Sequence, residues 1–434
     1  MKERFHILDQ QIAKFTEFGV IIVLATETDV DLLHLRNTSQ KLAAQWPIDH
    51  QPRDCGDLPI AWQSKTFDHP LEVLLPGLSQ QSQRDESIES LFDFECGWRS
   101  TLSPSALSMS AIKLHDACLL RFSVQHVLCD ATGLNCIVQA YCSLLQGKSL
   151  QPLESRPDPI RMRKGTASVS SLSDTETRSA YLAQFQITSS RVGWGPALDM
   201  ILWNAFVPPK RISTCCIPSV EHLLKLARKS EKKVTAHDLV MAHIWKASAA
   251  SPSWKRQRKD QNIYPPFSFA LNIEKFLDRT SELHNRWMVV TVPDLERTTN
   301  NEQEEILGMA LHLRDTIKSA RTFAYLQPVL DHYRKADGAP IMPWTDGLSA
   351  GVFCSSWGKS PLYDLSFDLP GAPGTRPMYI QPYIHSSPVL RALRQKVHNT
   401  VLTWTDRDHR FWIHGSLGDE VWLELDRLNK THSD

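Results

Sequence analysis

Excess charge of either sign and long apolar runs are both absent from this sequence of 434 residues. Lys and Arg together number 48, and so do Asp and Glu, so the formal net charge is zero. A chain without net charge offers no global electrostatic reason to bind nucleic acid or an anionic membrane. The apolar run at residues 20–25 is too short for a signal peptide, and no run approaches the length of a bilayer span. We therefore expect a cytoplasmic monomer with no nucleic-acid partner and no membrane partner.

Patterns that hold metals or disulfides are missing as well. The nine cysteines form no C-x-x-C pair, and Cys118, Cys129 and Cys136 lie in strongly apolar surroundings, as buried thiols in a reducing compartment do. None of the 17 histidines is spaced as in H-x-x-x-H or H-E-x-x-H. We therefore expect no metal site and no bound cofactor.

The spacing of apolar residues predicts strands and helices in irregular alternation, which favours an α/β fold with mixed layers. Strands are predicted at residues 19–25, 118–124, 267–271, 287–292, 351–355, 378–380 and 411–414. Helices are predicted at residues 31–44, 134–147, 220–227, 236–249, 302–320 and 418–428. Proline residues followed by a Ser/Thr-rich run make residues 152–177 linker-like. The predicted division is an N-terminal half, residues 1–175, a crossover, residues 176–209, and a C-terminal half, residues 210–434.

Residues 125–133 read QHVLCDATG and lie between a predicted strand and a predicted helix. A strand end is rigid and can hold an imidazole at a fixed place in a cleft. Because imidazole titrates near neutrality, His126 suits proton removal from an alcohol or amine. Asp130 could brace the loop or orient the ring, and Gly133 permits a tight entry into the helix. On spacing alone, H-x-x-x-D recurs by chance, and a histidine at a strand end is more often structural.

Several segments, taken in order, resemble the motifs of the BAHD-type acyltransferases, particularly their fungal secondary-metabolite branch, and more distantly the condensation domains of peptide synthetases. Residues 7–9 resemble the family's opening, and residues 126–133 its H-x-x-x-D-G motif with Ala131 in place of the glycine. Residues 235–245 resemble its S-x-x-D-x-L-x-A-x-x-W helix, and residues 355–364 the strand that precedes its D-F-G-W-G motif. The resemblance covers nearly the whole chain.

This resemblance implies two similar mixed-sheet domains, like those of chloramphenicol acetyltransferase, with an active-site channel between them. It implies that His126 is the general base, with Asp130 as its structural brace. The acyl group would pass from acyl-CoA, a co-substrate, to a hydroxyl or amine of a small, hydrophobic secondary metabolite. A carrier-protein thioester is the alternative donor. By analogy, Ser355 and Trp357 are candidate donors to the oxyanion, and with Gly133 they are the predicted substrate-binding residues.

One departure from the family pattern lies in the D-F-G-W-G region. Aligned on Phe367, the family's aspartate becomes Ser366, and a shift by two residues makes it Asp368 but loses the following aromatic. That motif is structural in the family, so the change bears on geometry more than on chemistry.

A second departure concerns the partner of Asp130. In the family, the motif aspartate pairs with an arginine, and here Glu274 stands at that position. Two carboxylates would face each other unless Lys275 or Arg279 substitutes. The departures keep two other readings open. One is a protein of the same fold that binds a hydrophobic small molecule and steers a cyclisation, and the other is a catalytically inactive binding protein.

Overall fold

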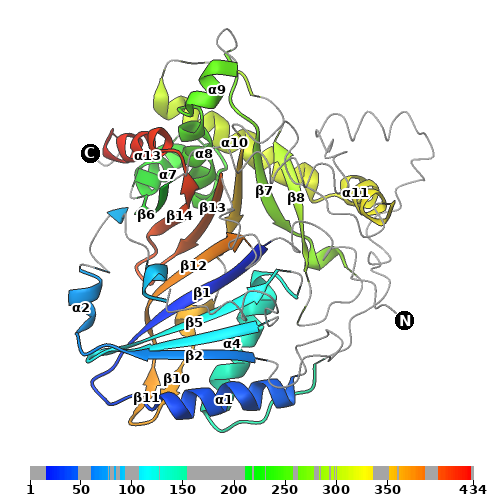
Figure 1. Ribbon diagram of the computed structural model, residues 1–434. Helices are drawn as coiled ribbons and strands as arrows, with labels where there is room; N and C mark the ends of the chain where they lie inside the picture. The colour runs from blue at the N-terminus through cyan, green and yellow to red at the C-terminus, as the bar shows by residue number, and fades with distance from the viewer. Residues whose placement is uncertain are drawn as a thin grey trace.

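The computed structural model shows two mixed β-sheets, each covered by helices (Figure 1). It describes residues 16–46, 60–76, 78, 83–84, 88–92, 107–126, 128–153, 211–217, 219–229, 231–257, 262–277, 283, 285–292, 295–297, 299, 301–335, 351–358, 361–386 and 399–431. The α/β fold class with two mixed sheets is therefore confirmed. Within the described ranges, no helix combines the length and apolar character needed to cross a bilayer.

The first sheet has five strands in the order β12-β1-β5-β4-β2. Their bounds are β12 (Pro377–Ser386), β1 (Thr16–Ala25), β5 (Ala117–Gln125), β4 (Leu107–Lys113) and β2 (Ile60–Thr66). Neighbouring strands are antiparallel except β2 and β4. Helices α1 (Leu32–Gln45) and α4 (Ala131–Leu145) cover one face, where the Tyr141 ring packs edge-on against Phe122 and its hydroxyl donates to the Leu35 carbonyl. The short helix α2 (Leu71–Leu74) and the 3-10 turn η3 (Ile88–Phe92) lie between β2 and β4 in the chain.

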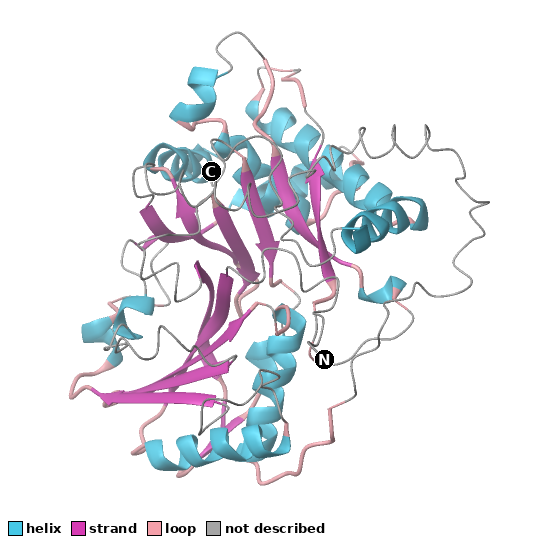
Figure 2. Cartoon of the chain, turned by 45° about the vertical axis from the view of Figure 1, so that its right-hand side comes forward, coloured by secondary structure: helices cyan, strands magenta, loops and turns pink. Residues whose placement is uncertain are grey.

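The second sheet has seven strands in the order β3-β6-β14-β13-β9-β7-β8. Their bounds are β3 (Gln83–Arg84), β6 (Arg211–Cys216), β14 (Phe411–Leu417), β13 (Thr400–Thr405), β9 (Val352–Ser356), β7 (Phe267–Asn272) and β8 (Trp287–Val292). Strand β9 runs parallel to both of its neighbours, β13 and β7. The helices of this half are α7 (Ser219–Lys229), α8 (Ala236–Ser248), α9 (Pro252–Gln257), α10 (Glu302–Ala320), α11 (Phe323–Lys335) and α13 (Asp419–Thr431). Figure 2 shows them grouped around the second sheet, away from the helices of the first.

Each sheet takes a strand from the other half of the chain. Strand β12, orange in Figure 1, pairs with β1, blue, through nine residue pairs at the first sheet's edge. Strand β3, from the N-terminal half, pairs with β6 in the second sheet. The boundaries predicted at residues 175 and 210 do not separate the two sheets, because each sheet contains a strand from both sides of them. The domain boundaries stay a prediction. The predicted crossover, residues 176–209, lies outside the described residues.

Most predicted elements are present, with ends that differ by a few residues. All seven predicted strands and all six predicted helices correspond to elements of the structure. Strands β12 and β14 are longer than predicted, and α4 begins at Ala131 rather than at residue 134. Strands β2, β4, β6 and β13 and helix α11 had no counterpart in the prediction. The hairpin of β10 (Phe367–Leu369) and β11 (Ala372–Thr375) is also new, as are the 3-10 turns η4 (Glu274–Phe276) and η5 (Pro361–Asp364).

Candidate functional site

The His126 loop connects the middle strand of the first sheet to helix α4. Strand β5 ends at Gln125, and its carbonyl accepts a hydrogen bond from the Leu128 amide at 2.8 Å, which closes a turn around His126. Because β5 pairs on both sides and is mostly buried, its end is a firm support for the ring. The predicted placement of His126 between a strand and a helix is thus confirmed.

Asp130 is buried and joins three parts of the structure. Its Oδ1 accepts hydrogen bonds from the amides of Thr132 at 2.9 Å and Gly133 at 3.1 Å, so it is the N-cap of α4. Its Oδ2 accepts a 2.7 Å hydrogen bond from the amide of Arg286, which immediately precedes β8 of the second sheet. Burial raises the pKa of the Asp130 carboxyl, and these three amides and the Arg286 charge oppose that rise.

Three consecutive residues of the second half, Asn285, Arg286 and Trp287, hold the His126 loop. The Asn285 side-chain amide donates to the His126 carbonyl at 2.9 Å and accepts from the Trp287 indole N–H at 3.1 Å. The Trp287 ring lies 5.3 Å from the His126 ring, centroid to centroid. We call residues 285–287 the clamp. The loop that carries His126 is therefore positioned by both sheets.

Aromatic rings surround His126 on the side of β1 and β9. The Phe18 ring lies 4.5 Å from the His126 ring, and the Trp357 ring lies 5.8 Å beyond it. On the other side, Phe353 packs against Trp287 with centroids 6.2 Å apart. These contacts place the imidazole in a largely apolar enclosure at the junction of the sheets.

Ser355 lies on the same strand as two residues of this enclosure. Phe353, Ser355 and Trp357 alternate along β9 and its extension, so their side chains share one face. Phe353 packs against Trp287, and Trp357 packs against Phe18. Trp287 and Phe18 in turn contact the His126 ring. The middle member, Ser355, is partly exposed.

Burial lowers the pKa of His126 from 6.5 to about 4, because the charged ring loses water in this enclosure. The Asn285 side chain and the carbonyls of His126 itself and Cys129 partly oppose the fall. The Nδ1 atom is buried and makes no regular hydrogen bond within the described part of the chain. At neutral pH the ring is therefore an uncharged base.

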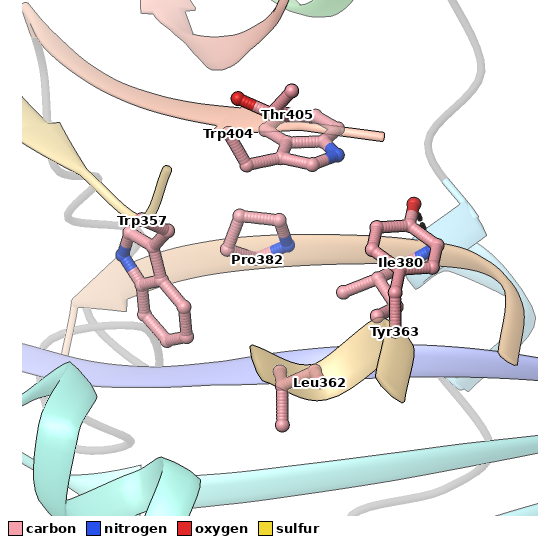
Figure 3. A pocket seen from close by; sticks show the side chains of 7 residues that line it. All are labelled: Trp357, Leu362, Tyr363, Ile380, Pro382, Trp404 and Thr405. Carbon is pink, nitrogen blue, oxygen red and sulfur yellow. Dashed lines mark hydrogen bonds between the residues drawn. The ribbon is translucent and has the colours of Figure 1, made fainter. Parts of the chain in front are cut away.

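A small pocket adjoins Trp357 (Figure 3). Apart from Trp357, it is lined by Leu362, Tyr363, Ile380, Pro382, Trp404 and Thr405, and its volume is about 10 Å³. That is space for about one water molecule. The Tyr363 hydroxyl accepts from the Ile380 amide at 3.1 Å, and the buried Trp404 indole N–H has no acceptor among the described residues. A water molecule or a small uncharged group with one hydrogen-bond acceptor fits such a lining.

The structure corrects two details of the sequence-based site. Helix α4 begins before Gly133, whose φ is not positive, so the helix entry does not depend on a glycine there. Lys275 lies over the Phe276 ring, and Asp130 accepts from the backbone amide of Arg286, so the suggested substitution by Lys275 is wrong. Arg279 lies outside the described residues.

The altered D-F-G-W-G region forms a closed hairpin. The carboxylate of Asp368 accepts from the Ser366 hydroxyl at 2.9 Å and from the Gly374 amide at 2.8 Å. Phe367 is completely buried in the first core, and the Ser366 carbonyl accepts from Gln146 at the end of α4. The aspartate of this hairpin is thus Asp368, and Ser366 is its partner.

Sequence reasoning did not find the clamp. The strand at residues 287–292 was predicted, but Asn285 and Arg286 carry no local pattern that links them to a loop about 160 positions earlier. Among the described residues, no group of three or more His, Cys, Asp or Glu side chains is arranged to hold a metal ion.

Two mixed sheets, each covered by helices and joined through the His126 loop, make up a fold of the chloramphenicol acetyltransferase type. The chain is similar to F. sporotrichioides TRI101, solved with coenzyme A and T-2, with a TM-score of 0.63 and 14% identity over 98% of this chain and 96% of that one. It is also similar to vinorine synthase, with a TM-score of 0.63 and 13% identity over 99% of this chain and 93% of that one.

A more distant likeness is to the first condensation domain of the calcium-dependent antibiotic synthetase. Its TM-score is 0.50 and its identity 10%, over 97% of this chain and 91% of that one. No protein-family model and no curated protein sequence matches the chain. The resemblance that the sequence motifs predicted is confirmed for the fold, and at these identities it reaches no further.

Proposed function

We propose that the protein transfers an acyl group from a coenzyme A thioester to a hydroxyl or amine of a small acceptor, with His126 as the general base. The observation that carries this proposal is the His126 loop, held by both sheets at their junction with its imidazole among aromatic rings. The structure of TRI101 with coenzyme A and T-2 supports the choice of donor and a small-molecule acceptor.

In the proposed reaction, His126 takes the proton of the acceptor as the acceptor's oxygen or nitrogen attacks the thioester carbon. The tetrahedral oxyanion then collapses, the carbon–sulfur bond breaks, and coenzyme A leaves as a thiol that takes the proton from the imidazolium. Ser355 and the indole of Trp357 are the side chains of β9 and its extension that can donate to the oxyanion.

A cysteine nucleophile is disfavoured by the burial of the thiols. Burial raises the pKa of the Cys118 and Cys354 thiols to about 12 and that of Cys216 to about 11. Because the thiolate is the nucleophile, these groups are poor acyl carriers at neutral pH. Direct transfer between the two substrates needs no covalent intermediate.

The experiment is a donor and acceptor panel with the purified chain. Acetyl-CoA, longer acyl-CoAs and dicarboxyl-CoAs are each incubated with small alcohols and amines, T-2 included, and thiol release is followed with and without acceptor. Coenzyme A binding is measured separately by calorimetry. Acceptor-dependent release supports the proposal and identifies the donor.

Binding of coenzyme A without release from any pair points to a non-transferring binder. Absence of both contradicts coenzyme A as donor and favours a carrier-protein thioester, tested next with an acyl-pantetheine carrier. The acceptor, the cytoplasmic location and the monomeric state stay predictions.

A further inference from the structure

The pocket beside Trp357 lies where the two sheets meet (Figure 3). Trp404 and Thr405 come from β13 of the second sheet, whereas Ile380 and Pro382 come from β12 of the first. The 3-10 turn η5 closes the pocket on a further side. Its walls therefore depend on the packing of both sheets.

The pocket is also close to the rings that contact His126. Trp357 lines the pocket, and its ring lies 5.8 Å from that of Phe18, which lies 4.5 Å from the His126 ring. Pro382 pairs with Val20, which is on the same face of β1 as Phe18. A group bound in the pocket would therefore lie next to the aromatic enclosure of His126.

Two lining side chains carry hydrogen-bond donors without acceptors in the described part of the chain. Trp404 is only 3% exposed, and its indole N–H is one of them. The Tyr363 hydroxyl accepts from the Ile380 amide at 3.1 Å, and its own O–H is the other. Figure 3 shows the Trp404 nitrogen on the side of the pocket where Tyr363 lies. Because a buried N–H without an acceptor is costly, an oxygen atom that enters the pocket is stabilised there.

The lining selects the kind of oxygen that fits. None of the seven lining residues is charged, so an ionised group would lose its hydration without gaining a counter-charge. Both free groups are donors, because burial raises the pKa of Tyr363 and keeps its hydroxyl protonated. The volume of about 10 Å³ admits about one water-sized group. A carbonyl oxygen meets all three conditions, whereas a hydroxyl would bring a donor of its own.

We propose that this pocket binds the carbonyl oxygen of an apolar substrate group, with the Trp404 indole and the Tyr363 hydroxyl as its donors. This inference rests on the proposed function, which supplies the substrates. Tyr363 and Thr405 are partly exposed, whereas the other five lining residues are buried, so the oxygen enters past these two. The carbonyl belongs either to the acyl chain or to the acceptor, and its chemistry is the same in both.

The first test reads the Trp404 indole itself and needs no turnover. The indole nitrogens of the 13 tryptophans are labelled with nitrogen-15, and the Trp404 signal is assigned by its loss in Trp404→Phe. Acetone and cyclopentanone are titrated in, with cyclopentene as the probe without oxygen and acetate as the charged probe. Tyr363→Phe removes the second donor. Trp245→Phe is the matched control, because the Trp245 N–H donates to the Pro265 carbonyl at 2.7 Å in the second core.

We expect both ketones to move the Trp404 indole proton downfield in a saturable way, because the N–H then has an acceptor. Cyclopentene and acetate should leave the signal in place. Tyr363→Phe should weaken ketone binding by about 3- to 10-fold, which corresponds to the loss of one neutral hydrogen bond. Trp245→Phe should bind the ketones as the wild type does, although its melting temperature is lower.

The second test locates the carbonyl in the reaction. Acetoacetyl-CoA is compared with butyryl-CoA as donor, and 4-hydroxycyclohexanone with cyclohexanol as acceptor. In one of these pairs, Trp404→Phe should lower kcat/KM for the ketone by about 3- to 10-fold and leave its partner unchanged. A response in the donor pair places the carbonyl in the acyl chain, and a response in the acceptor pair places it in the acceptor. Trp245→Phe should change neither pair.

The proposal is overturned if neither ketone moves the Trp404 signal, since the pocket then holds water only. It is also overturned if Trp404→Phe affects both members of each pair alike. Should Trp404→Phe fail to fold, the wild-type titration and Tyr363→Phe decide, because one indole signal of the 13 should respond to ketones alone. Should the ketones bind as expected while no donor is turned over, the carbonyl site stands and the proposed acyl transfer fails.

Discussion

The side-chain amide of Asn285 donates a hydrogen bond to the backbone carbonyl of His126 at 2.9 Å, across the junction of the two sheets. Asn285 is completely buried, so this bond has no water to replace it. The residue that the sequence marks as the base is therefore held by a residue that the sequence does not mark at all. Displacement of one sheet relative to the other would move His126.

Asn285→Asp tests this hydrogen bond with little change in shape. The new carboxylate still accepts from the Trp287 indole but cannot donate to the His126 carbonyl. We expect the free energy of unfolding to fall by about 1–3 kcal/mol and the transfer rate by about tenfold or more. Asn262→Asp is the matched control, since Asn262 donates to the Arg297 carbonyl at an exposed position far from the loop. If the transfer rate falls equally in the two variants, the clamp has no role in catalysis.

The pH dependence of transfer should report the lowered pKa of His126. With a pKa of about 4, the ring is deprotonated and able to act as base down to pH 5. We expect kcat/KM at pH 5.5 to be within about twofold of its value at pH 7.5, whereas a base with the ordinary pKa of 6.5 would lose about tenfold. Stopped assays in constant-ionic-strength buffers, with folding checked by circular dichroism at each pH, give the profile. A tenfold loss between these pH values contradicts the apolar enclosure.

Away from the His126 loop, the buried carboxylate of Glu89 links one strand of each sheet through two histidines. Glu89 of η3 accepts from His385 of β12 at 2.6 Å and from His414 of β14 at 2.8 Å. Burial alone would raise the pKa of Glu89, but the two histidines outweigh it and hold the pKa well below 4.5. A lowered folded pKa means that this cluster contributes its full stability above the unfolded pKa and loses it as the pH falls through the folded value.

Glu89→Gln should therefore destabilise the protein at pH 7 by about 3 kcal/mol. The difference from wild type should shrink as the pH is lowered below 4.5, because protonation then removes the same charge from the wild type. Urea unfolding of both proteins at pH 7, 5 and the lowest pH at which the wild type folds measures the difference. A constant difference across this series would show that the charge of Glu89 is not what the histidines stabilise.

Gly19 in β1 is a position where only hydrogen fits. A Cβ atom there would lie 2.1 Å from the Phe122 carbonyl oxygen and 2.4 Å from the Tyr383 hydroxyl. We expect Gly19→Ala to destabilise the protein by about 1–3 kcal/mol or more, through displacement of β5 or β12. Gly308→Ala in α10 is the control, because nothing lies within 4 Å of its Cβ and alanine favours the helix. If both changes are neutral in thermal melts, the close approach of β1 to its neighbours is not as described.

The sequence predicts those parts of the fold whose signals are local. The apolar run of β1 and the periodic helix α4 stand out because one is buried on both faces and the other on a single stripe. Strands β2 and β4 were missed because their polar and apolar residues mix in short segments, such as IAWQSKT and LSMSAIK. Their assignment depends on pairing with each other in parallel, which no local pattern contains.

The candidate site divides in the same way. His126 and Asp130 are visible because strand, turn and N-cap follow one another within a few residues. Arg286 could not be predicted as a site residue, because its hydrogen bond to Asp130 depends on the packing of β8 beside the His126 loop. Glu274 was read as a repulsive partner for Asp130, but its carboxylate accepts from the Arg286 guanidinium, and Asp130 accepts from the Arg286 backbone amide. The sequence alone therefore does not predict which charged residues far apart in the chain lie close together.

Substitution of His126 measures the central claim most directly. His126→Ala and His126→Gln are compared with wild type in acceptor-dependent thiol release, with coenzyme A affinity and melting temperature measured on the same samples. We predict that kcat falls by about 10²- to 10⁴-fold while coenzyme A still binds and the fold persists. Transfer that continues at the wild-type rate in a folded, coenzyme A-binding variant would contradict the assignment of His126 as the base.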